Sequence, residues 1–166
     1  MRTPALSESI QDYLKAIYQL KDADGVATIS SLAERLGVSR ASASAMAKKL
    51  AALDLVAARE RYRAVELTHA GDQIAVEVIR HHRLLELYLA QTLGVAVENV
   101  HAEADKLEHV LSEELEARID RALGFPTHDP HGDPIPDAKL EWPAAPSAGR
   151  RTSAPGDRAS RRARRA

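Results

Sequence analysis

Residues 28–67 contain two short helical patterns that are separated by a glycine and followed by two short strand patterns. We expect the first helix to begin at Thr28 or Ser30, because hydroxyl side chains cap helix starts. It should end at Gly37, because glycine readily takes the backbone conformation that ends a helix. Ser39 is then placed to cap the second helix. Two helices joined by a short glycine-containing turn form a helix-turn-helix.

Two short strands are predicted after this pair of helices, at residues 55–57 and 64–67. The segment between them carries Arg59, Arg61 and Arg63, so the hairpin has a cationic tip. A basic hairpin directly after a helix-turn-helix is typical of a winged helix, a fold that most often binds double-stranded DNA.

The residues expected to contact DNA follow from this assignment. The second helix of a helix-turn-helix enters the major groove with its N-terminal residues nearest the bases. Arg40 is the residue there that can read guanine through two hydrogen bonds. The full set of candidates is Ser39, Arg40, Ser42, Ser44, Lys48 and Lys49 on the helix, with Arg59, Arg61 and Arg63 on the wing.

Helical spacing of apolar residues also predicts a first helix over 7–21, a long helix over roughly 70–92 and a further helix over about 100–123. A break is expected from Gly94 to Asn99. Four prolines in 126–136 exclude regular structure there. The fold class is therefore mainly α: an N-terminal winged helix-turn-helix followed by an all-helical domain.

The charge is divided in the same way along the chain. Residues 1–70 hold 10 Lys and Arg against 8 Asp and Glu, a balance of +2. Residues 71–137 hold 5 against 14, or −9, and residues 138–166 hold 8 against 2, or +6. We take these as a DNA-binding domain, a helical domain and a disordered basic tail that adds nonspecific DNA affinity or none.

The acidic helical domain carries His and carboxylate residues at spacings that suit a metal site. His82 and Glu86 are four residues apart on the long helix, so they share a face. The next predicted helix has a similar face made of His101, Asp105, Glu108 and His109. The chain has no cysteine, and oxygen and imidazole ligands without sulfur suit Mn2+ or Fe2+.

At this point the chain resembles the iron- and manganese-dependent repressors, the family of the diphtheria toxin repressor and the manganese transport regulator. The resemblance covers about residues 7–137. The segments that carry it are 12–20 (DYLKAIYQL), 67–71 (LTHAG), 82–86 (HRLLE), 108–109 (EH) and 131–136 (HGDPIP).

The resemblance implies which residues bind metal. Asp12 matches a ligand on the first helix, together with Asp105, Glu108 and His109; the second position corresponds to His82, Glu86 and His101. Iron-type members have Met and Cys at the positions of Asp12 and Asp105, so carboxylates there favour Mn2+ over Fe2+. Lys15 stands where some members have a ligand Glu, and we exclude it from the ligand set.

The resemblance further implies a repressor of metal uptake genes that binds a palindromic operator. Reading a palindrome requires a homodimer. We expect the dimer to form through the helical domain, because its apolar residues outnumber those that two packed helices can bury. They are Ile74, Val78, Leu85, Leu89, Val110 and Leu111.

The sequence leaves three alternatives to this hypothesis. A winged helix can respond to a small organic ligand instead of a metal, or serve only as a protein-interaction module. A metallohydrolase needs a separate base and a substrate cleft, for which no motif is present, so we expect no enzyme. No stretch approaches the length of a membrane span, and we expect a cytoplasmic protein without the third domain of the larger relatives.

Overall fold

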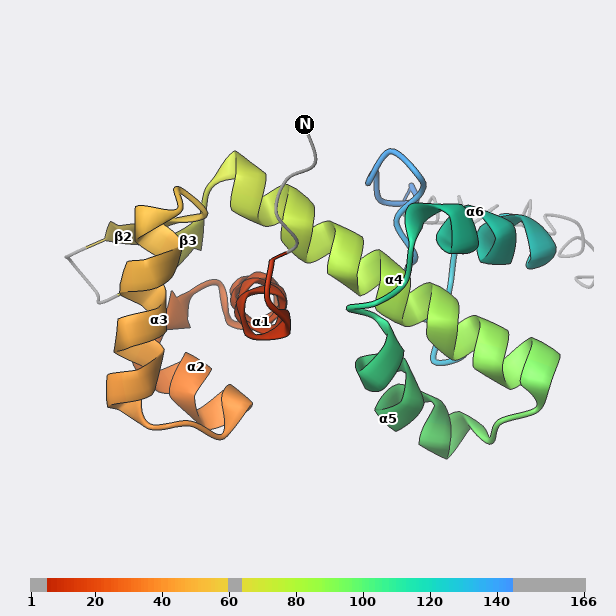
Figure 1. Cartoon of the computed structure of the whole chain (residues 1–166), viewed down its shortest axis with the longest axis horizontal. Coiled ribbons are helices and arrows are strands. Elements are labelled where there is room, and N and C mark those ends of the chain that lie inside the picture. Colours follow the sequence, from red (N-terminus) through yellow and green to blue (C-terminus); the bar gives the residue numbers. More distant parts are fainter. Residues whose placement is uncertain (1–5, 60–63, 145–166) are drawn as a thin grey trace, which may run out of the picture.

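The computed structural model describes residues 6–59 and 64–144. The first half of this part contains α1 (Glu8–Asp24), α2 (Ile29–Leu36) and α3 (Arg40–Ala52), with β1 (Ala27–Thr28), β2 (Val56–Arg59) and β3 (Ala64–Leu67). The second half contains α4 (His69–Leu93), α5 (Val97–Leu107) and α6 (Glu113–Ala122). The long helix α4 crosses the molecule from one half to the other (Figure 1). The mainly α fold with an N-terminal winged helix-turn-helix is confirmed.

The helix-turn-helix forms where the sequence places its capping residues. Thr28 and Ser31 form a capping box, in which each side chain accepts a hydrogen bond from the other residue's backbone N–H. Gly37 ends α2 with φ 64°, a left-handed conformation that glycine adopts without strain. Ser39 caps α3 by accepting the backbone N–H of Ser42 at 3.0 Å.

A small antiparallel sheet supports the wing. Its strand order is β1-β3-β2, with Ala27 opposite Val65 and Val56 opposite Leu67. The strand β1 was not predicted, because two residues are too few to show an alternating pattern. The core of this half lies between α1, α2, α3 and the sheet, and its fully buried side chains include Leu14, Ile17, Leu32 and Leu50.

The helix predicted over 100–123 is wrong in one respect, because the chain forms two helices there. α5 ends at Leu107 and α6 begins after Ser112, whose hydroxyl accepts the N–H of Leu115. His109 therefore lies in the turn between the helices and not on a helical face with His101. α5 also begins within the segment that was expected to be a break.

The expected reason for dimerisation is also wrong at the residue level. Val78, Leu85 and Leu89 are buried within the single chain, in which α1, α5 and α6 pack against α4. Val110 is exposed, and so are other large apolar side chains of the second half. These are Leu93, Val97, Leu107, Leu115 and Phe125.

The segment after α6 folds back over the second half. Its anchor is Arg80 of α4, which is 2% exposed and donates to the Pro136 carbonyl at 2.6 Å and to Asp120 at 2.8 Å. Farther along, Trp142 stacks on Tyr18 of α1 with ring centroids 5.9 Å apart. Within residues 138–144 of the predicted tail, Trp142 thus contacts the folded part, and most of the other residues are exposed. Residues 145–166 lie outside the described residues.

None of the helices in the described part of the chain is long and apolar enough to cross a membrane.

The start of α4 packs so closely on the first half that only glycine fits at position 71. A Cβ on Gly71 would lie 2.0 Å from the backbone oxygen of Leu55. We predict that Gly71→Ala lowers the free energy of unfolding by about 1–3 kcal/mol, the usual cost of overpacking. Thermal or urea unfolding measures this, with Ala70→Ser at the exposed neighbouring position as the control. Equal stability of the two variants would show that the helix can shift away from Leu55.

Candidate metal centre

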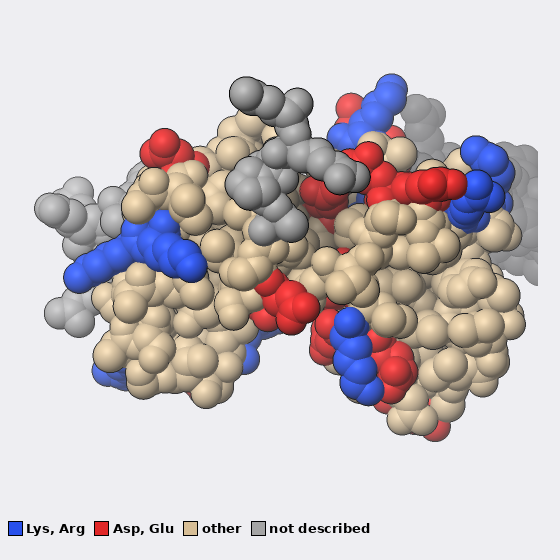
Figure 2. All heavy atoms as spheres, in the orientation of Figure 1, with Lys and Arg blue, Asp and Glu red and all other residues tan. Residues whose placement is uncertain are grey.

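The predicted metal ligands converge where α1, α4 and the end of α5 meet. An open cleft of about 600 Å³ lies at this junction, and Asp12, His101, Asp105 and His109 are among the residues that line it. Figure 2 shows acidic side chains near the middle of the same face, between the halves that contain α3 and α5. All seven candidates fall into groups whose ligand atoms lie within 4.8 Å of one another.

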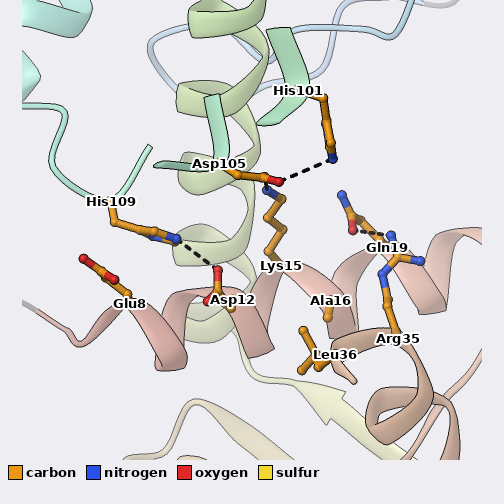
Figure 3. Close-up of a pocket in the computed structure, with 10 residues that line it drawn as sticks. All are labelled: Glu8, Asp12, Lys15, Ala16, Gln19, Arg35, Leu36, His101, Asp105 and His109. Carbon is orange, nitrogen blue, oxygen red and sulfur yellow. Dashed lines mark hydrogen bonds and ion pairs between the residues drawn. The ribbon is translucent and has the colours of Figure 1, made fainter. Parts of the chain in front are cut away.

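The first group joins the two halves of the molecule. Asp12 of α1 lies 3.0 Å from Nε2 of His109, and Oε1 of Glu108 lies 3.4 Å from the same nitrogen. Nδ1 of His109 donates to the side-chain oxygen of Gln11 at 2.8 Å. This hydrogen bond leaves Nε2 directed at the two carboxylates, as a metal-binding imidazole requires. Figure 3 shows the His109 ring pointing at Asp12 across the cleft.

The second group lies deeper along α4. Oε1 of Glu86 is 3.1 Å from Nε2 of His82 and 3.1 Å from Nδ1 of His101. The two rings meet edge to face with centroids 4.7 Å apart. His82 and Glu86 are buried, whereas the side chain of His101 is 66% exposed. One imidazole edge of this group therefore faces solvent, which leaves a route of entry for an ion.

Asp105 belongs to neither group as predicted. Its carboxylate lies 3.3 Å from Nδ1 of His82, and with Glu108 these residues form a third set of neighbouring ligand atoms. Figure 3 shows Asp105 directed toward His101 and the end of Lys15, away from Asp12. Asp105 thus shares its set of neighbouring ligand atoms with His82 and Glu108 and not with Asp12 and His109, and the metal position that it would serve stays a prediction.

A fourth set was missed by the sequence analysis. Asp129 and His131 lie in the proline-containing segment after α6, and they form a set with Glu86, in which His131 faces Oε2 whereas His82 faces Oε1. Nδ1 of His131 is 3.7 Å from Glu86, and Asp129 is fixed by the backbone N–H groups of His131 and Asp133. The motif around His131 carried the family resemblance, but a loop without periodicity gave no reason to place it beside α4.

The donors of this cluster fit a divalent cation of hard to borderline character. Glu86 and Glu108 are 3% and 1% exposed, and a buried carboxylate needs a positive partner. The donors are carboxylate oxygens and imidazole nitrogens, and the chain has no cysteine. Such a set suits Mn2+, Fe2+ or Zn2+ and gives no advantage to ions that prefer sulfur.

Contacts within the cluster shift the pKa values of its histidine and carboxylate side chains. Burial disfavours the charged form of His82, but hydrogen bonds to Glu108 and Glu86 outweigh it and raise its pKa to about 9. Burial also opposes ionisation of Glu86, yet hydrogen bonds from His82 and His101 lower its pKa to about 2. Burial raises the pKa of Asp12. Without metal, protonated His82 thus supplies one positive charge to the carboxylates.

His81, the neighbour of His82, fixes the turn that carries two of the ligands. Its Nδ1 donates to the backbone oxygen of Glu108 at 3.1 Å, and its Nε2 donates to Glu116 of α6 at 3.0 Å. Burial works against its charge, but the contact with Glu116 outweighs this and raises the pKa of His81. This role of His81 was not predicted, because a histidine beside a candidate ligand shows no pattern of its own in the sequence.

The predicted DNA-contacting residues lie on the opposite side of α3 from the core. Arg40, Ser42, Lys48 and Lys49 are exposed, and Ser44 is half-buried. The hydroxyl of Ser39 caps the helix and also forms a hydrogen bond with the Ser42 hydroxyl at 2.9 Å. Its first role is therefore structural. Figure 2 shows Lys and Arg side chains on the half that contains α3, as well as others on the second half. The backbone of Arg59 ends β2, whereas Arg61 and Arg63 lie outside the described residues.

Comparisons with known proteins agree with both halves of the structure. Residues 5–65 match the family model of the iron dependent repressor, N-terminal DNA binding domain. Residues 68–137 match the model of the iron dependent repressor, metal binding and dimerisation domain. Both models favour regulation by metal over regulation by an organic ligand.

Individual relatives point the same way. The chain is 38% identical over 133 residues to the iron-dependent repressor IdeR of Mycobacterium tuberculosis, which is 79% of this chain and 56% of the relative. It is 34% identical over 132 residues to the diphtheria toxin repressor of Corynebacterium diphtheriae, covering 79% of this chain and 58% of that protein. The chain therefore spans a little under three fifths of the length of these relatives.

Solved structures extend the comparison to manganese regulators. One is a manganese-dependent transcriptional repressor in complex with manganese, with a TM-score of 0.76 and 46% sequence identity over 82% of this chain and 63% of the other. Another is the manganese regulator SloR, with a TM-score of 0.66 and 34% identity over 78% of this chain and 63% of the other.

The raised pKa of His82 predicts how the metal-free protein responds to pH. A histidine has a pKa of about 6.5 in an unfolded chain. The folded state binds the proton more tightly, so the stabilisation is complete below pH 6.5 and is lost as the pH rises to about 9. In the presence of a chelator, the melting temperature should fall over this interval, and His82→Gln should remove most of the slope. An unchanged slope in that variant would contradict the assignment.

Proposed function

The chain belongs to the family of iron-dependent repressors, and on this premise we propose that it is a transcription regulator that binds operator DNA when a divalent metal ion is held between its two domains. The observation that carries the proposal is the meeting of Asp12 with His109 at 3.0 Å. Asp12 lies on α1, which is part of the domain matched as DNA-binding. His109 and Glu108 lie in the domain matched as metal-binding.

The ligands would couple metal binding to the orientation of the recognition helix α3. A divalent ion supplies the positive charge that lets Asp12, Glu108 and His109 share one site. Without it, burial and the charge of Glu108 raise the pKa of Asp12, whereas His109 and Lys15 lower it, so the ion would relieve the remaining repulsion across the boundary between the domains. Holding Asp12 in place fixes α1, and α2 and α3 move with α1 because they share its core.

We propose His82, Glu86 and His101 as a second metal position, and we add Asp129 and His131 as further candidate ligands beside Glu86. Their support is the short separation of their ligand atoms and the burial of Glu86. This second position lies wholly within the second half, so it would stabilise that half without directly linking it to α1.

The preferred metal is proposed to be Mn2+, with Fe2+ as the alternative. Asp12 and Asp105 offer oxygen donors, and the described cluster contains no sulfur. Hard oxygen donors suit Mn2+ better than sulfur donors do, although they do not reverse the general preference of proteins for later transition metals.

We also propose that the protein acts as a homodimer on a palindromic operator. One recognition helix contacts only a few base pairs, so specific binding needs two copies at a fixed spacing. The second half supplies exposed apolar side chains that a partner copy could cover, among them Val110 and Phe125. The relatives' names describe metal-dependent repressors, and we propose metal uptake genes as the target of repression, as the family resemblance implies.

The link through Asp12 can be tested directly. DNA fragments are first selected by the protein from a random pool in the presence of Mn2+. We predict that Mn2+ tightens binding of the unaltered protein to these fragments by about 5- to 150-fold, the usual range of coupling between two sites. Asp12→Ala should abolish this tightening, as a gel-shift titration with Mn2+ and with chelator would show.

The matched control is Asp22→Ala, which removes an exposed carboxylate from the same helix. It should retain the response to Mn2+. If Asp12→Ala responds to Mn2+ as the unaltered protein does, the bridge between the domains does not control DNA binding.

The DNA-contacting face has a separate test. Arg40→Ala should weaken binding to the selected fragment by about 1–3 kcal/mol and relax the preference at one base pair. Lys48→Ala should weaken binding to all sequences alike and lower the salt dependence by about one ion. The control Lys106→Ala, on α5, should do neither. Fluorescence anisotropy at several salt concentrations distinguishes these results, and equal effects of all three variants would place the DNA elsewhere.

A further inference from the structure

Lys15 of α1 places its ammonium group in the middle of the metal cluster. Nζ lies 2.8 Å from both carboxylate oxygens of Glu108 and 3.3 Å from Asp105. It is also 3.3 Å from Nδ1 of His82. The three residues that it contacts are the same three that form the set His82, Asp105 and Glu108. In Figure 3 the Lys15 side chain rises from α1 and ends beside Asp105.

The ion pair between Lys15 and Glu108 is largely buried and does not lie on the surface. The side chain of Lys15 is 12% exposed and that of Glu108 is 1% exposed. A buried carboxylate without a positive partner is costly, and removing one partner of such a pair leaves that cost in place. Moving the ammonium of Lys15 away would therefore leave Glu108 as a buried charge with one partner fewer.

The ammonium also prevents a metal from occupying the position between His82, Asp105 and Glu108. A protonated lysine has three donors and no lone pair, so it cannot coordinate a cation. Its positive charge repels a divalent ion at short range. Both oxygens of Glu108 and one of Asp105 face the ammonium, and these are the oxygens that an ion at this position would need.

The sets on either side of Lys15 keep ligand atoms of their own. Asp12 and His109 face each other on one side. On the other side, His82 turns Nε2 toward Glu86 and His101 while Nδ1 faces Lys15 and Glu108. The ammonium of Lys15 thus already places a positive charge between the two candidate metal positions.

We propose that Lys15 is an internal cation that takes the place of a metal ion between His82, Asp105 and Glu108, and so sets the number of ions that the chain binds. This proposal rests on the proposed function, because it assumes that the neighbouring sets hold metal. It makes Lys15 a residue that determines metal stoichiometry, and it keeps the Asp12 set apart from the Glu86 set.

The test counts bound ions. The unaltered protein, Lys15→Gln, Lys15→Glu and Lys15→Arg are each dialysed to equilibrium against Mn2+, and the metal per chain is measured by elemental analysis. We expect Lys15→Gln and Lys15→Glu to bind one more ion per chain than the unaltered protein. Lys15→Arg should bind the same number as the unaltered protein, because it keeps the charge.

The matched control is Lys21→Glu, which makes the same change of charge at an exposed position on α1. It should leave the number of ions unchanged. A second measurement uses the Mn2+ electron paramagnetic resonance signal, which should broaden in Lys15→Glu, because ions that share Glu108 would lie close enough to interact magnetically.

The stability of the variants gives an independent readout if Lys15→Glu folds poorly without metal. Lys15→Gln should melt at a lower temperature than the unaltered protein in chelator, because Glu108 loses its partner. Added Mn2+ should then raise its melting temperature by more than it raises that of the unaltered protein. A purely structural role for Lys15 would lower the stability without adding a bound ion.

An equal number of ions in the unaltered protein, Lys15→Gln and Lys15→Glu would overturn the proposal, since the ammonium would then exclude nothing. The proposed function fails in a different way, if Asp12→Ala binds as many ions as the unaltered protein. The two failures are read from different variants and are therefore distinguishable.

Discussion

The structure depends on how the buried carboxylate of Glu108 is neutralised. This side chain is 1% exposed and lies where α1, α4 and the turn after α5 meet. Lys15 reaches it from α1, His82 reaches it from α4, and His109 follows it in the chain. Each positive or polar partner comes from a different element, so the charge of Glu108 holds the two halves together.

The helix α4 makes this arrangement possible because it belongs to both halves. Its first turn fits against Leu55 through Gly71, and its middle carries His82 and Glu86 to the cluster. Arg80 on the same helix fixes the returning segment that brings Asp129 and His131 to Glu86. The same helix therefore connects the cluster in its middle to the packing of the first half at its start.

The elements that the sequence predicted well are those whose boundaries are local. Gly37 and Ser39 mark the turn of the helix-turn-helix through backbone conformation and capping, which need no distant contact. The break between α5 and α6 was missed because the apolar spacing continues through it and neither glycine nor proline marks it. The cap at Ser112 is the one local indication, and it is weaker than the periodicity.

The candidate metal ligands show the same difference between residues placed by local spacing and residues placed by distant contacts. His82 and Glu86 share a helical face, so their spacing alone brings them together. The neighbours of Asp105 could not be read from spacing, because they depend on the angle at which α5 crosses α4. Asp129, His131, Gln11 and His81 depend on contacts between segments far apart in the chain, which periodicity does not report.

The uneven charge of the two domains bears on how metal binding would affect DNA binding. Residues 1–70 have a balance of only +2, which is modest for a protein that must hold a DNA backbone. Residues 71–137 have a balance of −9, and five of their carboxylates lie in or beside the metal cluster: Glu86, Asp105, Glu108, Asp129 and Asp133. Filling the cluster with cations reduces the negative charge next to a weakly basic DNA-binding domain. Metal binding in such a chain would favour DNA through the field of the whole protein as well as through the bridge at Asp12, and Lys15 fixes how much of that charge is supplied before any ion binds.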